Sequence, residues 1–439
     1  METPEAYEIY LLDLLTSSAV PRQVTHNQAI EEDLQWSPDS RHLFFLVRMG
    51  AVEGKYVDVQ NRVYSVTPAG EVRRWGEKFL GAVDSFGVQP DGALVIAGQQ
   101  GTQQPLLRLT SPTAAPIPLS QPEGTYGRLS VAQAGPAVAY VYSRLTSPSE
   151  VYISGSGSPG SAIAITSFNK LFTERDLPQG RPYRWKADDD TEVEGMLVYP
   201  AGRFLEKNLP MLVLIHGGPA DADGDRFSAD WYDWAILAAS RGWLVFRPNY
   251  RGSSGYGDKF MREIVPHLVS RPGKDILAGV DALVRDGIAD PDRLAIGGYS
   301  YGGYMTNWLI TETPRFKAAV TGAGAVEHAA NWGNDDLTFD DAFYLGGAPW
   351  EVPQVYNDEA ALWRLNRVRT PTHIVVGADD IRVSAAENYL LERALHTLQV
   401  PSSLLVFPGE GHSLKKNPWH GKIKVREELE LLQKYVPVR

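Results

Sequence analysis

The strongest constraint on the fold is a change in the pattern of apolar residues near the middle of the chain. From the start to about residue 167, short runs of Val, Tyr, Phe, Leu and Ile are separated by turn residues, without a helical period. After the acidic segment 186–190, short apolar runs alternate with amphipathic segments. At about 150 residues per domain, the chain has room for two or three domains. We expect a β domain over 1–167 and an α/β domain over 168–439.

The first domain is predicted to be all-β. A weak repeat, in which a turn leads directly into a strand, recurs at Pro38, Pro90 and Gly135. A period of about 50 residues with several short strands favours the blades of a β-propeller, and a plain β-sandwich is the alternative. A Gly/Ser/Pro-rich turn is expected at 154–161. The expected strands are 7–13, 41–47, 62–66, 93–97, 106–109, 137–141 and 150–153.

The second domain is predicted to be an α/β fold with a mostly parallel sheet. Its apolar runs are short, as in strands that are buried on both faces, and helical patterns separate them. The expected strands are 211–215, 243–246, 294–297, 317–320, 373–376 and 404–407. The expected helices are 275–285, one from about residue 302, 385–398 and one around 425–435.

Composition excludes several classes of protein. The chain has no Cys, which rules out disulfides, thiolate nucleophiles and cysteine-bound metal centres. The formal net charge of −11 argues against a nucleic-acid partner. The first residues are acidic, and no apolar stretch approaches the roughly 20 residues that span a bilayer. We expect a cytoplasmic protein without a membrane segment.

The most informative motif is a G-x-S-x-G sequence formed by Gly298, Ser300 and Gly302. It follows an expected strand directly and precedes an expected helix, which is the context of a nucleophile elbow. Glycines are needed there because side chains would clash at the sharp turn. A serine hydroxyl is a weak nucleophile, so it needs an imidazole base and a carboxylate that orients this base. A structural Gly-rich turn is the alternative reading of the motif.

Candidate partners for Ser300 follow in the order acid, then histidine. Asp379 and Asp380 come directly after the expected strand 373–376, and His412 lies in a glycine-flanked loop after the strand 404–407. Functional side chains of α/β sheets lie at such carboxyl ends of strands. Taken singly, a loop Asp caps a turn and a loop His is a solvated surface group. Their order and their positions favour a catalytic triad.

A second requirement of acyl transfer is a pair of backbone donors for an oxyanion. The segment 216–219, His-Gly-Gly-Pro, ends the expected strand 211–215, and its glycines allow close approach of main-chain N–H groups. We expect the amides of Gly218 and Tyr301 to form the oxyanion hole. His216 is interpreted as a structural residue that braces this loop.

Together these motifs resemble the prolyl oligopeptidase family of serine peptidases, and most closely its acylaminoacyl-peptidase and dipeptidyl-aminopeptidase-like branch. The resemblance covers about residues 165–436, and more weakly the β part, because the family carries an amino-terminal β-propeller. The motifs that carry it are His216–Pro219, Asn249–Gly257, Gly298–Met305, Gly377–Val383 and Gly409–His412.

The resemblance implies a triad of Ser300, Asp380 and His412, since the family acid matches Asp380 and not Asp379. It also implies that Arg382 binds a backbone carbonyl of the substrate, and we place Trp332 in the substrate site as well. A solvated Arg382, or one paired with Asp379, is the alternative. One departure is clear: at roughly 45 residues a blade, the first domain has room for only three or four blades. We therefore expect a truncated, propeller-like domain.

The predicted function is hydrolysis of peptide bonds, aminoacyl or acylaminoacyl, through an acyl-enzyme. A carboxylesterase acting on small acyl esters is the first alternative, because an open site would admit such substrates. An inactive binding protein is the second. We expect no cofactor and no metal, and a peptide or small acyl substrate. Open edges of an incomplete propeller must be covered, either by the α/β domain or in a homodimer.

Overall fold

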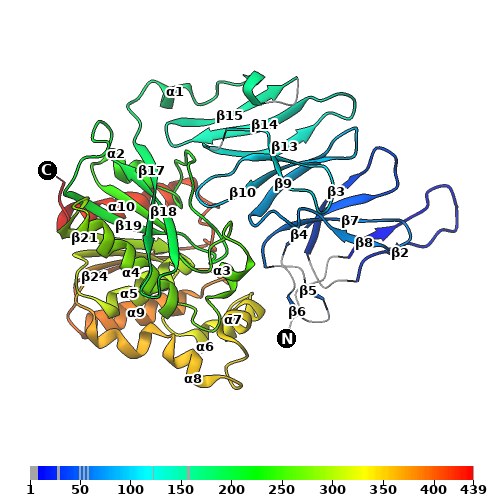
Figure 1. The fold of residues 1–439 in the computed structure, drawn as a ribbon. Helices are drawn as coiled ribbons and strands as arrows, with labels where there is room; N and C mark the ends of the chain where they lie inside the picture. Colours follow the sequence, from blue (N-terminus) through cyan, green and yellow to red (C-terminus); the bar gives the residue numbers. More distant parts are fainter. Residues whose placement is uncertain are drawn as a thin grey trace.

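The computed structural model describes residues 8–26, 30–48, 51–52, 55–56, 59–121, 123–155 and 159–438. Two fan-like halves are visible in Figure 1, an all-β half and an α/β half, joined by the segment that carries α1 (Lys170–Thr173). The expected fold class, an α/β hydrolase fold preceded by a truncated, propeller-like β domain, is confirmed. Tyr7 and the centre of the turn expected at 154–161 lie outside the described residues.

The β half contains three antiparallel sheets of four strands each. Figure 1 shows them as successive blades above and beside the α/β half. In the order of their pairing, the first has β3 (Ile30–Trp36), β4 (Leu43–Arg48), β7 (Arg62–Val66) and β8 (Val72–Arg74). The second has β9 (Ala82–Val88), β10 (Leu94–Gln99), β11 (Leu106–Leu109) and β12 (Ile117–Pro118). The third has β13 (Thr125–Val131), β14 (Val138–Arg144), β15 (Ser147–Ser154) and β16 (Ile163–Ala164).

Apolar side chains fill the spaces between these sheets. Phe44 and Leu46 of the first sheet pack with Phe86 and Ile96 of the second, all of them buried. Val95 and other residues on the opposite face of the second sheet pack against the third. The middle sheet is therefore buried on both faces, as it is in a propeller blade.

The two outer sheets differ in how their remaining faces are covered. Two short hairpins accompany the sheets: β1 (Tyr10–Leu11) with β2 (Arg22–Gln23), and β5 (Ala51–Val52) with β6 (Lys55–Tyr56). Ile9 and Val24, next to the first hairpin, join Phe45 in a small core on the first sheet. On the third sheet, Ile153 and Ile163 keep 37% and 64% of their surface exposed. The outer face of the first sheet is thus covered by the segment next to the first hairpin. The third sheet keeps exposed apolar side chains.

The α/β half is built on one sheet of eight strands, in the order β17-β18-β20-β19-β21-β22-β23-β24. β17 and β18 pair antiparallel, β18 pairs antiparallel with β20, and all later pairs are parallel. The bounds are β17 Gln179–Lys186, β18 Glu192–Tyr199, β19 Leu209–Ile215, β20 Leu244–Asn249, β21 Ala289–Tyr299, β22 Ala318–Gly322, β23 Thr372–Gly377 and β24 Ser402–Phe407.

Helices cover both faces of this sheet. The longer ones are α4 (Ser270–Arg285), α5 (Tyr301–Glu312), α9 (Ala385–Thr397) and α10 (Pro418–Tyr435). Shorter ones are α2 (Ala235–Ser240), α3 (Asp258–Arg262), α6 (His328–Asn334), α7 (Thr338–Leu345) and α8 (Pro353–Asp358), with the 3-10 turns η1 (Pro159–Ser161) and η2 (Ala361–Arg367). None of the helices in the described ranges is both long and apolar enough to cross a membrane.

Among the described residues, the polar contacts between the two halves include the following three places. Asp258, in the first turn of α3, accepts hydrogen bonds from the amides of Val59 and Gln60. The carboxylate of Glu194 on β18 accepts the amide of Thr102 at 2.9 Å. The third place is the loop 219–233, which is examined below. These contacts dock the β half on the α/β half.

Candidate active site

Ser300 stands at a sharp turn between β21 and α5. Its backbone angles are φ 60° and ψ −128°, so this residue is held in a strained conformation at the N-cap of the helix. A Cβ on Gly298 would lie 2.6 Å from the carbonyl carbon of Gly302, and a Cβ on Gly302 would clash with the carbonyl oxygen of Ile215. Both glycines are thus required by the packing of the turn. The geometry is that of a nucleophile elbow.

His412 and Asp380 are hydrogen-bonded to each other. The distance from Nδ1 of His412 to Oδ2 of Asp380 is 2.8 Å. The Asp380 side chain is fully buried, whereas that of His412 is 27% exposed. A carboxylate accepts a hydrogen bond, so this contact favours a proton on Nδ1, and in the neutral ring Nε2 is then the acceptor. This is the tautomer that a general base requires.

The other oxygen of Asp380 is held by its own loop. Oδ1 accepts the amide N–H groups of Arg382 at 2.9 Å and of Val383 at 3.0 Å. Asp379, by contrast, is exposed. The structure thus orients the Asp380 carboxylate from one side and leaves its second oxygen for the histidine.

The loop that carries His412 is anchored by two groups that the sequence pattern did not single out as functional. The buried Glu410 accepts the amides of Lys416 and Asn417 and a bond from His420. Although burial opposes it, these hydrogen bonds lower the pKa of Glu410. Tyr299 donates to the carbonyl of His412 at 2.9 Å, and burial raises the pKa of this phenol well above its usual range. Both groups fix the position of the imidazole.

One expected oxyanion donor directly follows Ser300, and the other belongs to the His-Gly-Gly-Pro loop. The amide of Tyr301 is the first of α5, so it has no partner within the helix and lies at the positive end of the helix dipole. Gly218 has a φ of 115°, and no hydrogen bond is recorded for its amide within the described part of the chain. A Cβ on the neighbouring Gly217 would lie 3.4 Å from the Cβ of Ser300. The His-Gly-Gly-Pro loop is therefore adjacent to the serine.

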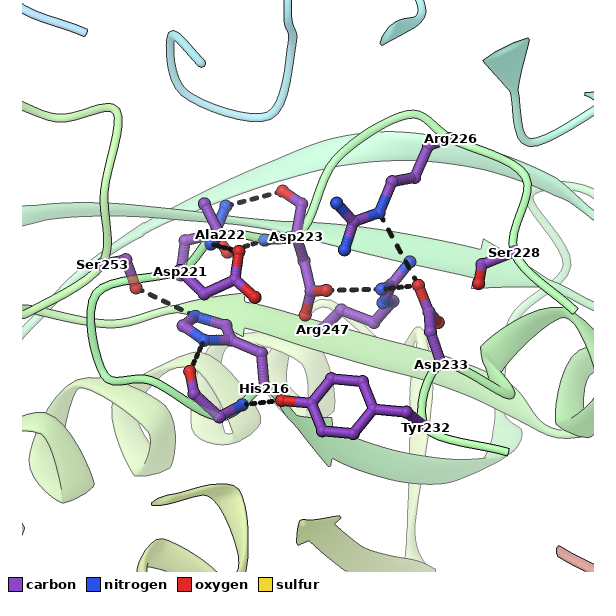
Figure 2. A network of polar contacts seen from close by, with 12 residues as sticks. His216, Asp221, Ala222, Asp223, Arg226, Ser228, Tyr232, Asp233, Arg247 and Ser253 are labelled. Atoms are coloured by element: carbon purple, nitrogen blue, oxygen red, sulfur yellow. Dashed lines mark hydrogen bonds and ion pairs between the residues drawn. The ribbon is translucent and has the colours of Figure 1, made fainter. Parts of the chain in front are cut away.

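His216 braces this loop, as the sequence suggested. Figure 2 shows its ring between Ser253 and the backbone of the loop. Nε2 lies 3.0 Å from the hydroxyl of Ser253, and Nδ1 lies 2.7 Å from the carbonyl of Gly217. The ring also stacks on Tyr250, whose hydroxyl donates to the carbonyl of His216 at 2.8 Å. The residue is buried and has a structural role.

Arg382 and Trp332 lie near each other in the chain segments beside the triad. The guanidinium of Arg382 pairs through two nitrogens with the carboxylate of Asp336, and the amide of Asp336 donates to the carbonyl of Ile381. Asp336 follows α6, which carries Trp332. Trp332 is half-buried and contacts Trp350 edge to face at 5.1 Å. The sequence had suggested Asp379 as a partner for the arginine, whereas Asp336 takes that place.

The fold and this geometry define a class: an α/β hydrolase with a serine at the elbow and an Asp–His pair at the ends of the following strands. Comparison with known proteins narrows the class. Residues 230–438 match the model of the prolyl oligopeptidase family. The α/β part of the chain is thus similar to the prolyl oligopeptidase family.

Individual relatives agree with this assignment. The chain is 30% identical to the uncharacterized peptidase YuxL of Bacillus subtilis over 277 residues, which are 61% of this chain and 40% of the relative. It is 33% identical to a probable dipeptidyl-peptidase 5 of Emericella nidulans over 258 residues, 57% of this chain and 35% of that one. The match thus spans two fifths or less of the length of each of these curated relatives.

Solved structures share the fold over nearly the whole chain. The acylaminoacyl peptidase of Pyrococcus horikoshii has a TM-score of 0.84 at 22% identity, covering 98% of this chain and 66% of that chain. A puromycin-hydrolyzing peptidase of Mycobacterium tuberculosis has a TM-score of 0.77 at 22% identity, with the same coverage. The likeness extends across both halves and therefore includes the arrangement of the β sheets on the hydrolase.

Proposed function

We propose that this protein is a serine peptidase that works through an acyl-enzyme. The observation that carries the proposal is the strained Ser300 at the elbow, together with the 2.8 Å bond between His412 and Asp380. The match of residues 230–438 to the model of the prolyl oligopeptidase family supports it. Peptides with a short acyl or aminoacyl amino-terminal part are the first substrates to consider, because relatives are named dipeptidyl-peptidases and structural neighbours acylaminoacyl peptidases.

In the proposed mechanism, Oγ of Ser300 attacks the scissile carbonyl carbon while Nε2 of His412 takes its proton. The tetrahedral oxyanion is held by the amides of Gly218 and Tyr301, and Asp380 stabilises the imidazolium. His412 then returns the proton to the leaving amine, and the C–N bond breaks. Water, activated by the same histidine, attacks the acyl-enzyme and releases the acid and the serine.

A carboxylesterase is the second candidate. The observation that favours it is the pairing of Arg382 with Asp336, because a guanidinium that is already neutralised binds a peptide carbonyl less strongly. The third reading is a binding protein without activity. The assembled Asp380–His412 pair argues against it, since an inactive protein has no need of this geometry.

The test starts from covalent labelling. The wild-type protein should react with one equivalent of a fluorophosphonate, the label should map to Ser300, and Ser300→Ala should not be labelled. Rates on aminoacyl anilides, acyl-blocked peptides and short-chain nitrophenyl esters are then compared. Faster turnover of peptides, relative to their intrinsic reactivity, supports the peptidase. Turnover of esters alone indicates the esterase, and a protein without labelling is not a serine hydrolase.

A further inference from the structure

One loop leads from the candidate oxyanion loop to the β half and then back to the oxyanion loop. Residues 219–233 follow the His-Gly-Gly-Pro loop and lead into α2; they are named the strap here. Figure 2 shows the strap rising from His216, with Asp221 and Asp223 on its first part and Tyr232 and Asp233 on its last. Its two ends therefore lie close together beside the active site.

At its last part, the strap touches the oxyanion loop directly. The hydroxyl of Tyr232 accepts the amide N–H of Gly217 at 2.9 Å. This amide and the carbonyl of His216, which accepts from Tyr250, belong to one peptide group. The next peptide group contains the carbonyl of Gly217, which lies 2.7 Å from the ring of His216.

These contacts set the direction of the candidate oxyanion donor. A peptide group is planar, so the carbonyl of Gly217 and the N–H of Gly218 point in fixed opposite directions. The contacts that hold the peptide groups 216–217 and 217–218 therefore also set the direction of the N–H of Gly218. Tyr232 is the only one of these anchors that comes from the strap.

The middle of the strap is hydrogen-bonded to the β half. Asp225 accepts the amide of Leu145 at 2.9 Å through its carboxylate and the hydroxyl of Thr125 at 3.1 Å through its carbonyl. The amide of Phe227 donates to the hydroxyl of Ser143 at 2.8 Å. Strands β13 and β14 and the turn that follows β14 are thus bound to the middle of the strap.

Between these two regions, a buried arginine holds the strap closed. Arg247 on β20 is 3% exposed, and its Nη2 binds the carboxylates of both Asp223 and Asp233, the latter at 2.7 Å. Figure 2 shows this guanidinium between the two carboxylates, with Arg226 approaching Asp233 from the outer side at 3.8 Å. Without Arg247, two buried carboxylates would face each other, which strongly disfavours the closed strap.

We infer that Arg247 and Tyr232 are positioning residues for the oxyanion hole: the arginine closes the strap under the docked β half, and the closed strap places the Tyr232 hydroxyl on the Gly217 amide. The inference rests on the acyl-transfer function proposed above. A buried ion pair that contributes only to stability is the competing explanation, and the two differ in what their loss does to the chemical step.

The test compares Tyr232→Phe and Arg247→Met with a matched control, Arg251→Met. Arg251 is also 3% exposed and also bridges two carboxylates, those of Asp275 and Asp189, but it does not touch the strap. Misplacing a catalytic group by about 1 Å costs up to about a hundredfold in rate. We expect kcat to fall about tenfold in Tyr232→Phe and up to about a hundredfold in Arg247→Met, with KM changed less than twofold.

The control separates positioning from stability. Arg251→Met should lower the melting temperature as much as Arg247→Met does and leave kcat unchanged. Affinity for a peptide trifluoromethyl ketone, whose adduct carries an oxyanion, should fall by the same factor as kcat in the strap variants. Losses of kcat that follow the melting temperature in all three variants would overturn the inference. Tyr232→Phe retains the packing of the ring and is the variant to rely on if Arg247→Met does not fold.

A second measurement does not depend on activity. Amide hydrogen exchange of the peptide that contains Gly217 should become faster in Tyr232→Phe and Arg247→Met, and stay at the wild-type rate in Arg251→Met. Asp225→Ala, which loosens the contact to the β half, should accelerate it as well. Unchanged exchange in the strap variants would sink the inference. An inactive, unlabelled wild type with the expected exchange pattern would instead refute the proposed function alone.

Discussion

At the scale of single residues, the two neighbouring aspartates after β23 provide the sharpest contrast. Asp380 is buried and bonded to His412, whereas Asp379 is exposed. Asp380→Asn should therefore keep the fold and lose about 10⁴-fold in kcat, because the amide favours the wrong histidine tautomer. Asp379→Asn should stay within a factor of two or so of wild type. Steady-state rates with melting temperatures as a control decide this, and the opposite ranking would identify Asp379 as the acid.

Arg382 is the residue that we propose to distinguish peptide from ester substrates. A hydrogen bond from a charged group is worth about 1.5–3 kcal/mol, so Arg382→Ala should lower kcat/KM on a dipeptidyl or longer substrate about ten- to a hundredfold. A small ester without the second carbonyl should be hydrolysed at nearly the wild-type rate.

The pairing of Arg382 with Asp336 adds a control to this prediction. Asp336→Asn keeps the arginine and removes the charge that neutralises it. It should raise kcat/KM for the peptide if the guanidinium binds the substrate. Equal losses on peptide and ester in Arg382→Ala would instead indicate a structural arginine, and no loss on either would remove its role in recognition.

The residues proposed to carry the chemistry could be singled out in the sequence, whereas those proposed to position them could not. Ser300, Asp380 and His412 each lie in a short motif at the end of a strand, and such motifs are legible locally. Tyr232 and Arg247 belong to no motif. Their proposed role rests on contacts between residues 14 or more positions apart, Tyr232 with Gly217 and Arg247 with Asp223 and Asp233.

At the scale of elements, the elbow depends on close backbone approach at Gly302. A Cβ there would clash with the carbonyl oxygen of Ile215 on β19, and backbone atoms cannot move aside cheaply. Gly302→Ala should therefore cost about 1–3 kcal/mol of unfolding free energy or more, and abolish labelling of Ser300. Gly333 in α6 is the matched control, because nothing lies within 4 Å of a Cβ added to it. Gly333→Ala should be neutral or slightly stabilising in urea denaturation, as expected for an alanine in a helix.

The carboxyl groups of the segment α6–α7 make the stability of the folded protein depend on pH. Burial raises the pKa of Asp340 from 3.8 to about 6, opposed by Arg382. The pKa in the folded state is higher than in the unfolded state, so the folded state binds more protons between these values. This contribution to stability is present below about pH 4 and is lost as the pH rises through about 6.

Asp340→Asn should remove the loss of stability that the wild-type protein shows as the pH rises through about 6. Relative to wild type, the variant should gain stability progressively from pH 4 to pH 7, measured as the difference between their urea midpoints at each pH. The comparison with wild type at the same pH cancels the contributions of carboxylates that do not interact with Asp340, whereas Asp335, Asp336 and Asp341, which do, contribute to the difference. A difference that is constant over this range would show that Asp340 does not titrate in it.

The sequence located some strands and missed others. Strands β7 and β11 and the central strands of the α/β sheet were placed within a few residues, whereas β17, the buried β18 and several strands of the β half were missed. Among the latter are β3, β9 and β13. Each of these three pairs with one strand only in its own sheet. An edge strand needs no continuous apolar run, and β3 and β13 also contain register shifts that break the alternation of side chains.

At the scale of the whole molecule, chain length limited the β half to three or four blades, and the described residues form three four-stranded sheets. How these sheets are docked could not be predicted, because docking depends on contacts between residues far apart in the sequence. Asp258 is the centre of one such contact. It accepts the amides of Val59 and Gln60 and pairs with the guanidinium of Arg62 at 3.2 Å, whose side chain is 2% exposed.

Asp258→Ala should therefore weaken docking of the β half. Removing the acceptor of buried donors costs about 1–3 kcal/mol, so we expect a lower urea midpoint for the β half and a wider separation between the unfolding of the two halves. Asp281→Ala is the control: its ion pair with Arg315 is largely exposed, and such pairs contribute about 0–1 kcal/mol. Hydrogen exchange during denaturation follows each half separately. Equal midpoints for Asp258→Ala and Asp281→Ala would mean that the buried contact does not hold the halves together.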